Sequence, residues 1–352
     1  MSVPPPAALF REGHYLTYPH SNGFCQDGHN VVLGRQEGRT ASLWRTSLEH
    51  EADRRICGMD VAAFGEKLLW FDVALNVDRL SVCAGNELWI YDLDSPKSGD
   101  CVYRADAPAQ LHSLSSISAD GRRVLVGLKY PDRHAALLVE IHTGKSRVLF
   151  EKPWHVNHLH FSPHDEAWIG ICHEGLCDTV PDRVWGWHAT GAPEGRCLLD
   201  HHWGDPAREI HIGHERWCFH ATTALAVAYG VSPGGPRGIY ECGPAQAPRL
   251  IVEGDRHWHV NVSWSGRFVV IDTTGPHDLP GKGWTDSNSI SDVLLLDRKS
   301  GELRCLARSR LDSHPSHPHP AFSRDEKIIL FNEAIPQPRG NRVRLVKNPF
   351  LA

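Results

Sequence analysis

The chain has 352 residues, and its 37 Lys and Arg against 42 Asp and Glu give a formal net charge of −5. No run of one sign stands out, so composition gives no electrostatic case for a nucleic-acid or membrane-surface partner. There is no apolar stretch of about 18 residues that could span a bilayer. The N-terminal residues lack the basic start and apolar core of a secretory signal, so we expect a cytoplasmic protein.

The predicted elements follow a repeated four-residue tag that resembles Ser-x-Asp-Gly and is preceded by a bulky apolar residue. Its six clear copies begin at Cys25, Ser118, Ser162, Cys218, Ser263 and Ser323. A degraded seventh copy lies at 76–79. Each tag is followed by an apolar run, a polar loop, a second run, a turn and a last short strand, as in 124–126, 136–141 and 147–150.

Short strands, turn signals and a period of roughly 40 to 60 residues are typical of a β-propeller. We therefore predict an all-β fold, a seven-bladed β-propeller with four antiparallel strands per blade, whose inner strands begin just before the tags. A strand within residues 8–18 is one way to complete the last blade. No linker or low-complexity segment interrupts the repeat, so we expect a single domain over residues 1–352. The ten cysteines form no Cys-x-x-Cys pair, which favours buried thiols over disulfides.

Histidine carries the functional signal. Of 24 histidines, 17 lie between His155 and His319. Four of them stand four residues before the first position of a tag: His158, His214, His259 and His319. Because equivalent positions of neighbouring inner strands line the channel of a propeller, we expect these imidazoles to approach one ion or ligand.

A metal site follows from the same spacing. In an extended strand His317 and His319 point to one face, as do His257 and His259. We predict a divalent metal held by His259, His317 and His319, with His314 as a fourth ligand. A hydrogen-bonded structural cluster is the alternative. Nitrogen donors suit Mn, Zn, Ni or Fe better than Ca, which prefers oxygen. The residue types alone do not choose among Mn, Zn, Ni and Fe.

Several motifs resemble one family when they are taken together. They are Trp154–Pro163, Cys172–Gly175, Asp182–Trp185, Glu209–Glu215, His259–Ser263 and His317–Ser323. In this order they resemble the oligogalacturonate lyases, a seven-bladed propeller family of polysaccharide lyases. Lyases of ulvan and of rhamnose-capped glucuronate chains have the same propeller, so the resemblance indicates fold more strongly than substrate.

The resemblance implies a metal-assisted β-elimination on short uronate oligosaccharides, giving a 4,5-unsaturated uronate. With it we expect manganese as the ion, and Zn, Ni, Fe or Ca are the alternatives. It makes His259, His317 and His319 metal ligands, and it places His314 where the family more often has glutamine. His214 resembles the catalytic base, and Arg183 resembles the arginine beside the substrate carboxylate. The substrate contacts expected in addition are His155, His158, His173 and Glu215.

Other interpretations stay open. His214 shares the register of His259 and could be a ligand, and Arg183 could pair with Asp182 or Glu215. Stacking on sugars or packing between blades is open for Trp154, Trp185, Trp203 and Trp217. We expect solvent exposure for His188, His201 and His202. A metal-dependent hydrolase or isomerase would give saturated products, and a non-catalytic scaffold would not need the clustered histidines. The oligomeric state is open.

Overall fold

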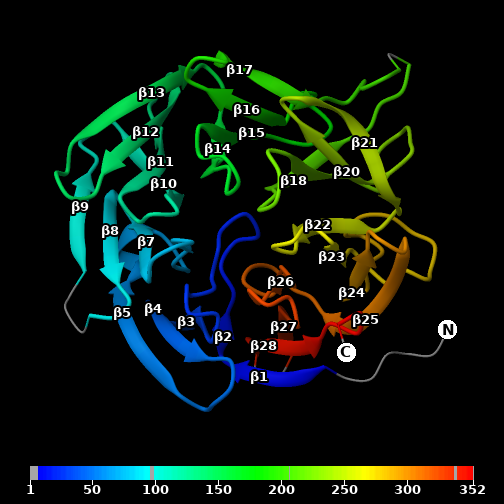
Figure 1. Ribbon diagram of the computed structural model, residues 1–352, viewed down its shortest axis with the longest axis horizontal. Coiled ribbons are helices and arrows are strands. Elements are labelled where there is room, and N and C mark those ends of the chain that lie inside the picture. Colours follow the sequence, from blue (N-terminus) through cyan, green and yellow to red (C-terminus); the bar gives the residue numbers. More distant parts are fainter. Residues whose placement is uncertain (1–6, 96–98, 206, 337–338, 352) are drawn as a thin grey trace. The chain divides into compact units, whose positions relative to one another are not determined.

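The computed structural model describes residues 7–95, 99–205, 207–336 and 339–351. These residues form strands β1 to β28 and one short 3-10 helix, η1 (Val61–Phe64). The strands make seven four-stranded sheets, in which sequence neighbours pair side by side (Figure 1). The predicted all-β, seven-bladed β-propeller with four antiparallel strands per blade is confirmed.

Six of the seven sheets are each built from four strands that are consecutive in the chain. The first contains β2 (His14–Tyr15), β3 (Asn30–Glu37), β4 (Thr40–Ser47) and β5 (Asp53–Asp60). The second contains β6 (Phe71–Val73), β7 (Arg79–Ala84), β8 (Glu87–Asp92) and β9 (Asp100–Arg104). The third contains β10 (Gln110–Ile117), β11 (Arg123–Lys129), β12 (His134–Glu140) and β13 (Ser146–Lys152). The fourth contains β14 (Val156–Phe161), β15 (Trp168–His173), β16 (Val184–His188) and β17 (Ala192–Leu199).

The last three sheets also have four strands each. The fifth contains β18 (Ile212–Trp217), β19 (Ala224–Ala228), β20 (Gly238–Gly243) and β21 (Gln246–Glu253). The sixth contains β22 (His257–Val262), β23 (Phe268–Thr273), β24 (Ile290–Asp297) and β25 (Glu302–Arg310). The seventh contains β26 (Ala321–Phe322), β27 (Ile328–Pro336), β28 (Arg339–Lys347) and the N-terminal β1 (Ala8–Glu12).

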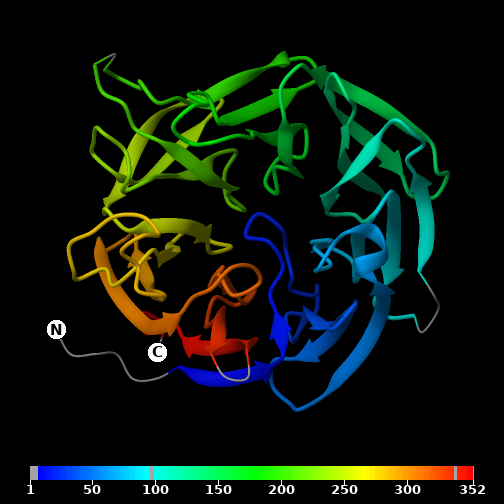
Figure 2. The same cartoon turned by 180° about the vertical axis from the view of Figure 1, so that it is seen from behind.

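The N-terminal strand completes the last sheet. β1 pairs antiparallel with β28, and Ala8 lies opposite Leu345. The same pairing of blue and red strands is visible from both sides (Figures 1 and 2). The strand predicted within residues 8–18 is therefore two strands, because the chain turns at Gly13 (φ 73°) before β2 begins.

The recurring tag forms the turn between an inner strand and the next strand. At Ser118 the N–H donates to the Arg123 carbonyl, and the Gly121 N–H returns to the Ser118 carbonyl. Gly121 has φ 68°, a left-handed conformation that glycine adopts without a Cβ clash. The hydroxyl of Ser118 donates to Asp120, whose carboxylate also accepts the Arg122 N–H. These local bonds explain why Ser, Asp and Gly recur at the tag.

The inner strands β10, β14, β18 and β22 share a bulge just before the tag. The pairing register of each shifts within one segment, and these segments are Leu111–Ser115, Asn157–His160, Gly213–Arg216 and His257–Val260. A β-bulge inserts extra residues into one strand and re-aims their side chains. The histidines found in the same register of the sequence, His158, His214 and His259, all lie within these bulges.

The described residues divide into two compact units, each with its own buried apolar clusters. One unit contains the described residues within 7–15, 175–186 and 195–351, and the other contains those within 16–174 and 187–194. Val262 and Ile271 belong to a cluster of the first unit, and Val126 and Leu137 to one of the second. The single domain over residues 1–352 stays a prediction. All ten cysteines are free thiols, as expected. Within the described ranges, none of the helical structure is long and apolar enough to cross a bilayer.

Candidate metal centre and active site

Five histidines lie close together in the first unit. His259 is on β22 and His214 is on β18. The segment that precedes β26 carries the other three, which are His314, His317 and His319. One ring nitrogen each of His259, His317 and His319 lies within 4.8 Å of the others. Their ring centroids are 4.4 to 5.5 Å apart. The His314 ring lies 4.1 Å from that of His317 but is not in this three-nitrogen group.

His317 and His319 do not lie in the extended strand that the sequence predicted. Their segment is irregular, with a turn at residues 314–315 and bends at 313 and 317, and β26 begins only at Ala321. His319 has φ 44°, and His158 and His214 have φ 50° and 49°. Non-glycine residues in this left-handed region cost of order 1–3 kcal/mol each and concentrate at functional sites. The prediction that His317 and His319 share the face of an extended strand is therefore wrong, although the two imidazoles do meet.

Asp272 on β23 holds two of the histidines. Its carboxylate accepts the backbone N–H of His259 at 2.7 Å and that of His319 at 3.1 Å. The Nδ1 of His259 lies 2.9 Å from Oδ2 and 3.0 Å from Oδ1 of the same carboxylate. A carboxylate that accepts from Nδ1–H directs the lone pair of Nε2 toward a cation, and metal-binding histidines usually have such a partner.

His214 is fixed by a carbonyl instead. Its Nδ1 lies 2.6 Å from the Trp258 carbonyl oxygen. Because a carbonyl only accepts, Nδ1 carries the proton of the neutral ring and Nε2 keeps a lone pair. The ring lies 4.2 Å from that of His259 and 5.4 Å from that of Tyr229. His214 therefore presents a basic nitrogen beside the three-nitrogen group.

A cavity of about 510 Å³ opens onto these side chains. Its walls are His214, Trp258, His259, Trp284, Ser313, His314 and His317. The segment that carries His317 is tied to β27, because Asn332 donates from Nδ2 to the His317 carbonyl and from its backbone N–H to the Pro318 carbonyl. The imidazoles thus line a cavity large enough for a small ligand.

The site favours neutral imidazoles. Burial, first of all, lowers the pKa of His317 to about 3 and that of His314 to about 4. Burial and then the neighbouring rings hold the pKa of His259 and His319 well below the usual range. Burial raises the pKa of Asp272 to about 8, against the lowering effect of the two backbone N–H donors. A cation bound by His259 would favour the ionised carboxylate.

This donor set fits a divalent transition metal. Three neutral imidazoles supply nitrogen lone pairs, and one is backed by a carboxylate. The Nδ1 of His317 is buried, and no group in the described part of the chain forms a hydrogen bond with it. His259, His317 and His319 are therefore the residues that could hold an ion, and His214 and His314 lie next to them.

Arg183 and Glu215 belong to the same unit. Arg183 is buried just before β16, and its Nη1 donates to the Gly175 carbonyl. Glu215 is buried on β18, next to His214 in the chain. Their roles toward a substrate stay predictions.

The other expected substrate contacts lie in the second unit. The ring of His173 stacks on Trp154 at 4.3 Å. His158 is buried, with its ring 5.0 Å from that of Tyr18. His155 joins His112 and His134 in a separate histidine group. Their roles in substrate binding stay predictions.

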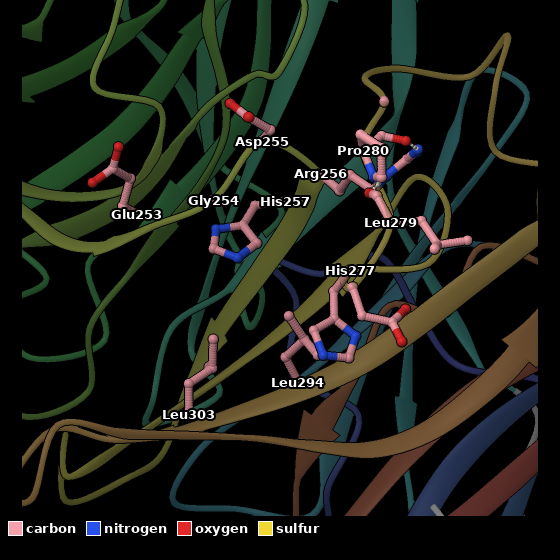
Figure 3. A pocket seen from close by; sticks show the side chains of 12 residues that line it. Glu253, Gly254, Asp255, Arg256, His257, His277, Leu279, Pro280, Leu294 and Leu303 are labelled. Atoms are coloured by element: carbon pink, nitrogen blue, oxygen red, sulfur yellow. Dashed lines mark hydrogen bonds between the residues drawn. The ribbon is translucent and has the colours of Figure 1, made fainter. Parts of the chain in front are cut away.

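Two predictions about individual side chains are wrong. His257 and His259 do not share one face of β22, because the bulge lies between them and they line different pockets. His257 lines a pocket of about 340 Å³, in which it lies between Gly254 and His277 (Figure 3). His201 is buried and does not lie in solvent. In addition, Trp217 is fully buried, so this tryptophan packs in the core and does not stack on a sugar.

Sequence reasoning missed Asp272, Trp258 and Trp284. Asp272 directly follows the apolar run 268–271. An acidic residue at the end of a buried strand needs a partner, and this was the signal in the sequence that could have indicated it. Trp258 and Trp284 line the cavity, and Trp284 is 38% exposed. The bulge that places Trp258 and the long 274–289 loop that carries Trp284 have no simple period in the sequence.

Fold and site together define a seven-bladed β-propeller with a candidate histidine metal centre. No family model matches the chain. It is 23% identical to the oligogalacturonate lyase of Dickeya dadantii over 206 residues, which are 56% of this chain and 51% of that protein. The chain thus spans about half the length of the curated relatives that it matches.

Solved structures extend the likeness over the whole fold. An oligogalacturonate lyase in complex with manganese has a TM-score of 0.78 at 18% identity and covers 99% of both chains. An oligogalacturonate lyase from Vibrio parahaemolyticus has a TM-score of 0.77 at 17% identity and covers 96% of this chain and 91% of that one. The resemblance to the oligogalacturonate lyase family is confirmed, and a relation to ulvan or rhamnose-glucuronate lyases stays a prediction.

Proposed function

We propose that this chain is a metal-assisted lyase that cleaves short uronate oligosaccharides, oligogalacturonates first, by β-elimination. One observation carries the proposal. The nitrogens of His259, His317 and His319 lie within 4.8 Å of one another in a cavity that also presents His214. The likeness to oligogalacturonate lyases supports the substrate class.

The reaction begins with removal of the proton on C5 of the uronate. The electron pair of that C–H bond forms the C4=C5 double bond as the C4–O bond breaks, and the glycosidic oxygen leaves with the neighbouring sugar and takes a proton from water. His214 suits the role of base because the Trp258 carbonyl holds the proton on Nδ1, so that Nε2 is the nitrogen that can accept another. As Nδ1 is already committed to a carbonyl, the imidazolium formed keeps that hydrogen bond. His214 is outside the three-nitrogen group, which favours base over metal ligand.

The negative charge of the uronate opposes carbanion formation, so the site must neutralise it. A divalent ion held by His259, His317 and His319 would supply Lewis-acid stabilisation at the carboxylate. Arg183 would add a fixed positive charge there, because guanidinium groups match carboxylates in geometry. Asp272 would orient His259 and keep its Nε2 toward the ion.

Manganese is the proposed ion, supported by the manganese complex of a structurally similar lyase. Zn, Ni, Fe and Ca remain alternatives, although calcium prefers oxygen ligands. A cavity of about 510 Å³ suits a short oligosaccharide, and Trp258 and Trp284 can face a sugar ring. Such fragments of pectin would reach the enzyme in the cytoplasm, the predicted location.

The test is to load the protein with Mn²⁺ and follow ultraviolet absorbance with galacturonate, glucuronate and iduronate disaccharides. We expect a rise from the conjugated double bond with galacturonate, and none with a His317→Gln variant. The exposed His142 offers a matched control, and His142→Gln should keep the activity. Saturated sugars as products would indicate a hydrolase, and no cleavage of any substrate would refute the proposal.

A further inference from the structure

A second group of three histidines lies in the other compact unit. His112 is on β10, His134 begins β12, and His155 lies between β13 and β14. One ring nitrogen of each lies within 4.8 Å of the others. Three segments that are apart in the chain thus bring three imidazoles to one point, and none of these residues belongs to the candidate metal centre of the first unit.

The spacing of this second group matches that of the first. Its ring centroids are 5.4, 5.2 and 4.6 Å apart, against 4.4 to 5.5 Å around His259. The Nε2 of His112 and the Nδ1 of His134 are 3.2 Å apart. Two nitrogens bound to one ion at roughly 2.0–2.1 Å with tetrahedral angles are separated by a similar distance.

The backbone makes room for the group. The bulge of β10 lies between Leu111 and Ser115, and it places His112 over Gly127 of β11. A Cβ added at Gly127 would lie 2.5 Å from Cδ2 of His112. The imidazole therefore occupies space that only glycine leaves open. A ring in solvent would not need this arrangement.

The electrostatic surroundings keep lone pairs available. Burial, followed by the neighbouring histidines, lowers the pKa of His112 to about 3, and burial lowers that of His134 to about 4. The nearby Lys129 acts in the same direction on both. The Nε2 of His155 is buried and has no hydrogen-bond partner among the residues that the structure describes. Such an orphaned buried nitrogen needs a partner, and a metal ion supplies one.

We propose that His112, His134 and His155 form a second transition-metal site. Three neutral nitrogen donors select borderline ions such as Zn²⁺, Ni²⁺ or Cu²⁺ over Mg²⁺ and Ca²⁺. The ion would join β10, β12 and the segment before β14. Because the unfolded chain does not hold these three rings together, binding stabilises this fold.

The test counts Zn²⁺ ions bound to the full-length protein by equilibrium dialysis and elemental analysis. We expect two in the wild type, one in His317→Gln, one in His134→Asn and two in the control His142→Asn. In the His317→Gln background, Zn²⁺ should also raise the melting temperature, and His134→Asn should abolish that rise. If His134→Asn does not fold, His155→Asn provides the same comparison.

Two results would overturn the second site. One is that His134→Asn or His155→Asn, folded, binds as many Zn²⁺ ions as the wild type. The other is that His317→Gln binds none, which would assign all bound zinc to the first centre. The count does not depend on lyase activity, so a protein without activity could still bind two ions, and an active lyase could bind one.

Discussion

Asp272→Asn tests the link between the buried carboxylate and the metal centre. The carboxylate accepts two backbone N–H groups and the Nδ1 of His259. Asparagine has a single acceptor oxygen, so at least one of these donors loses its acceptor, and the negative charge behind His259 disappears. Loss of the hydrogen-bond partner of a metal-binding histidine weakens metal binding about 10–100-fold. That corresponds to about 1.4–2.8 kcal/mol of binding free energy.

Calorimetric titration with Mn²⁺ measures this loss, and chemical denaturation measures stability. The unpaired donor should also cost about 1–3 kcal/mol of unfolding free energy. Asp292→Asn is the matched control. Asp292 is equally buried and accepts Nδ1 of His277 at 2.6 Å, yet His277 lies outside the three-nitrogen group.

The control should lose stability and keep its Mn²⁺ affinity. If folded Asp272→Asn binds Mn²⁺ as tightly as the wild type, Asp272 does not orient a metal ligand. An equal loss of affinity in both variants would mean that general destabilisation is the cause.

Three further predictions follow from the site and its buried histidines. His214→Gln should lower kcat on galacturonate oligomers by about 10²–10⁴-fold with an unchanged Mn²⁺ dissociation constant, whereas a weakened affinity would make His214 a ligand. Dialysis against a chelator should abolish activity and Mn²⁺ should restore it; full activity after exhaustive dialysis would contradict metal assistance. Burial lowers the pKa of His257 to about 4. In the unfolded state His257 binds a proton once the pH falls below its usual pKa of about 6.5, whereas in the folded state it stays neutral over the same range. The free energy of unfolding should therefore decrease by roughly 2 kcal/mol between pH 7 and 5. Urea unfolding of the wild type and His257→Gln measures this, and an equal pH dependence in both would refute it.

Local chemistry made the fold predictable. The tag at Ser118 is defined by hydrogen bonds within six residues and by a left-handed glycine, so it is visible in sequence. The four-residue offset of His214 and His259 from their tags was visible for the same reason. The bulges that direct these rings were not visible in the sequence, because a bulge depends on how its strand pairs with the next strand.

Long-range contacts account for what the sequence did not show. Asp272 is 13 residues from His259 and meets it only across paired strands. Strand alternation wrongly predicted one face for His257 and His259, because alternation fails at a bulge. The neighbours that bury His201 come from other segments, since its N–H donates to the carbonyl of Pro181. The approach of His112, His134 and His155 likewise depends on two strands of one sheet, β10 and β12, and on the segment between β13 and β14.

Anomalous X-ray diffraction from Mn²⁺-loaded crystals tests the central claim most directly. It should place one manganese within coordination distance of ring nitrogens of His259, His317 and His319, beside His214. Manganese bound elsewhere, with these three nitrogens bonded only to protein groups or water, would contradict it.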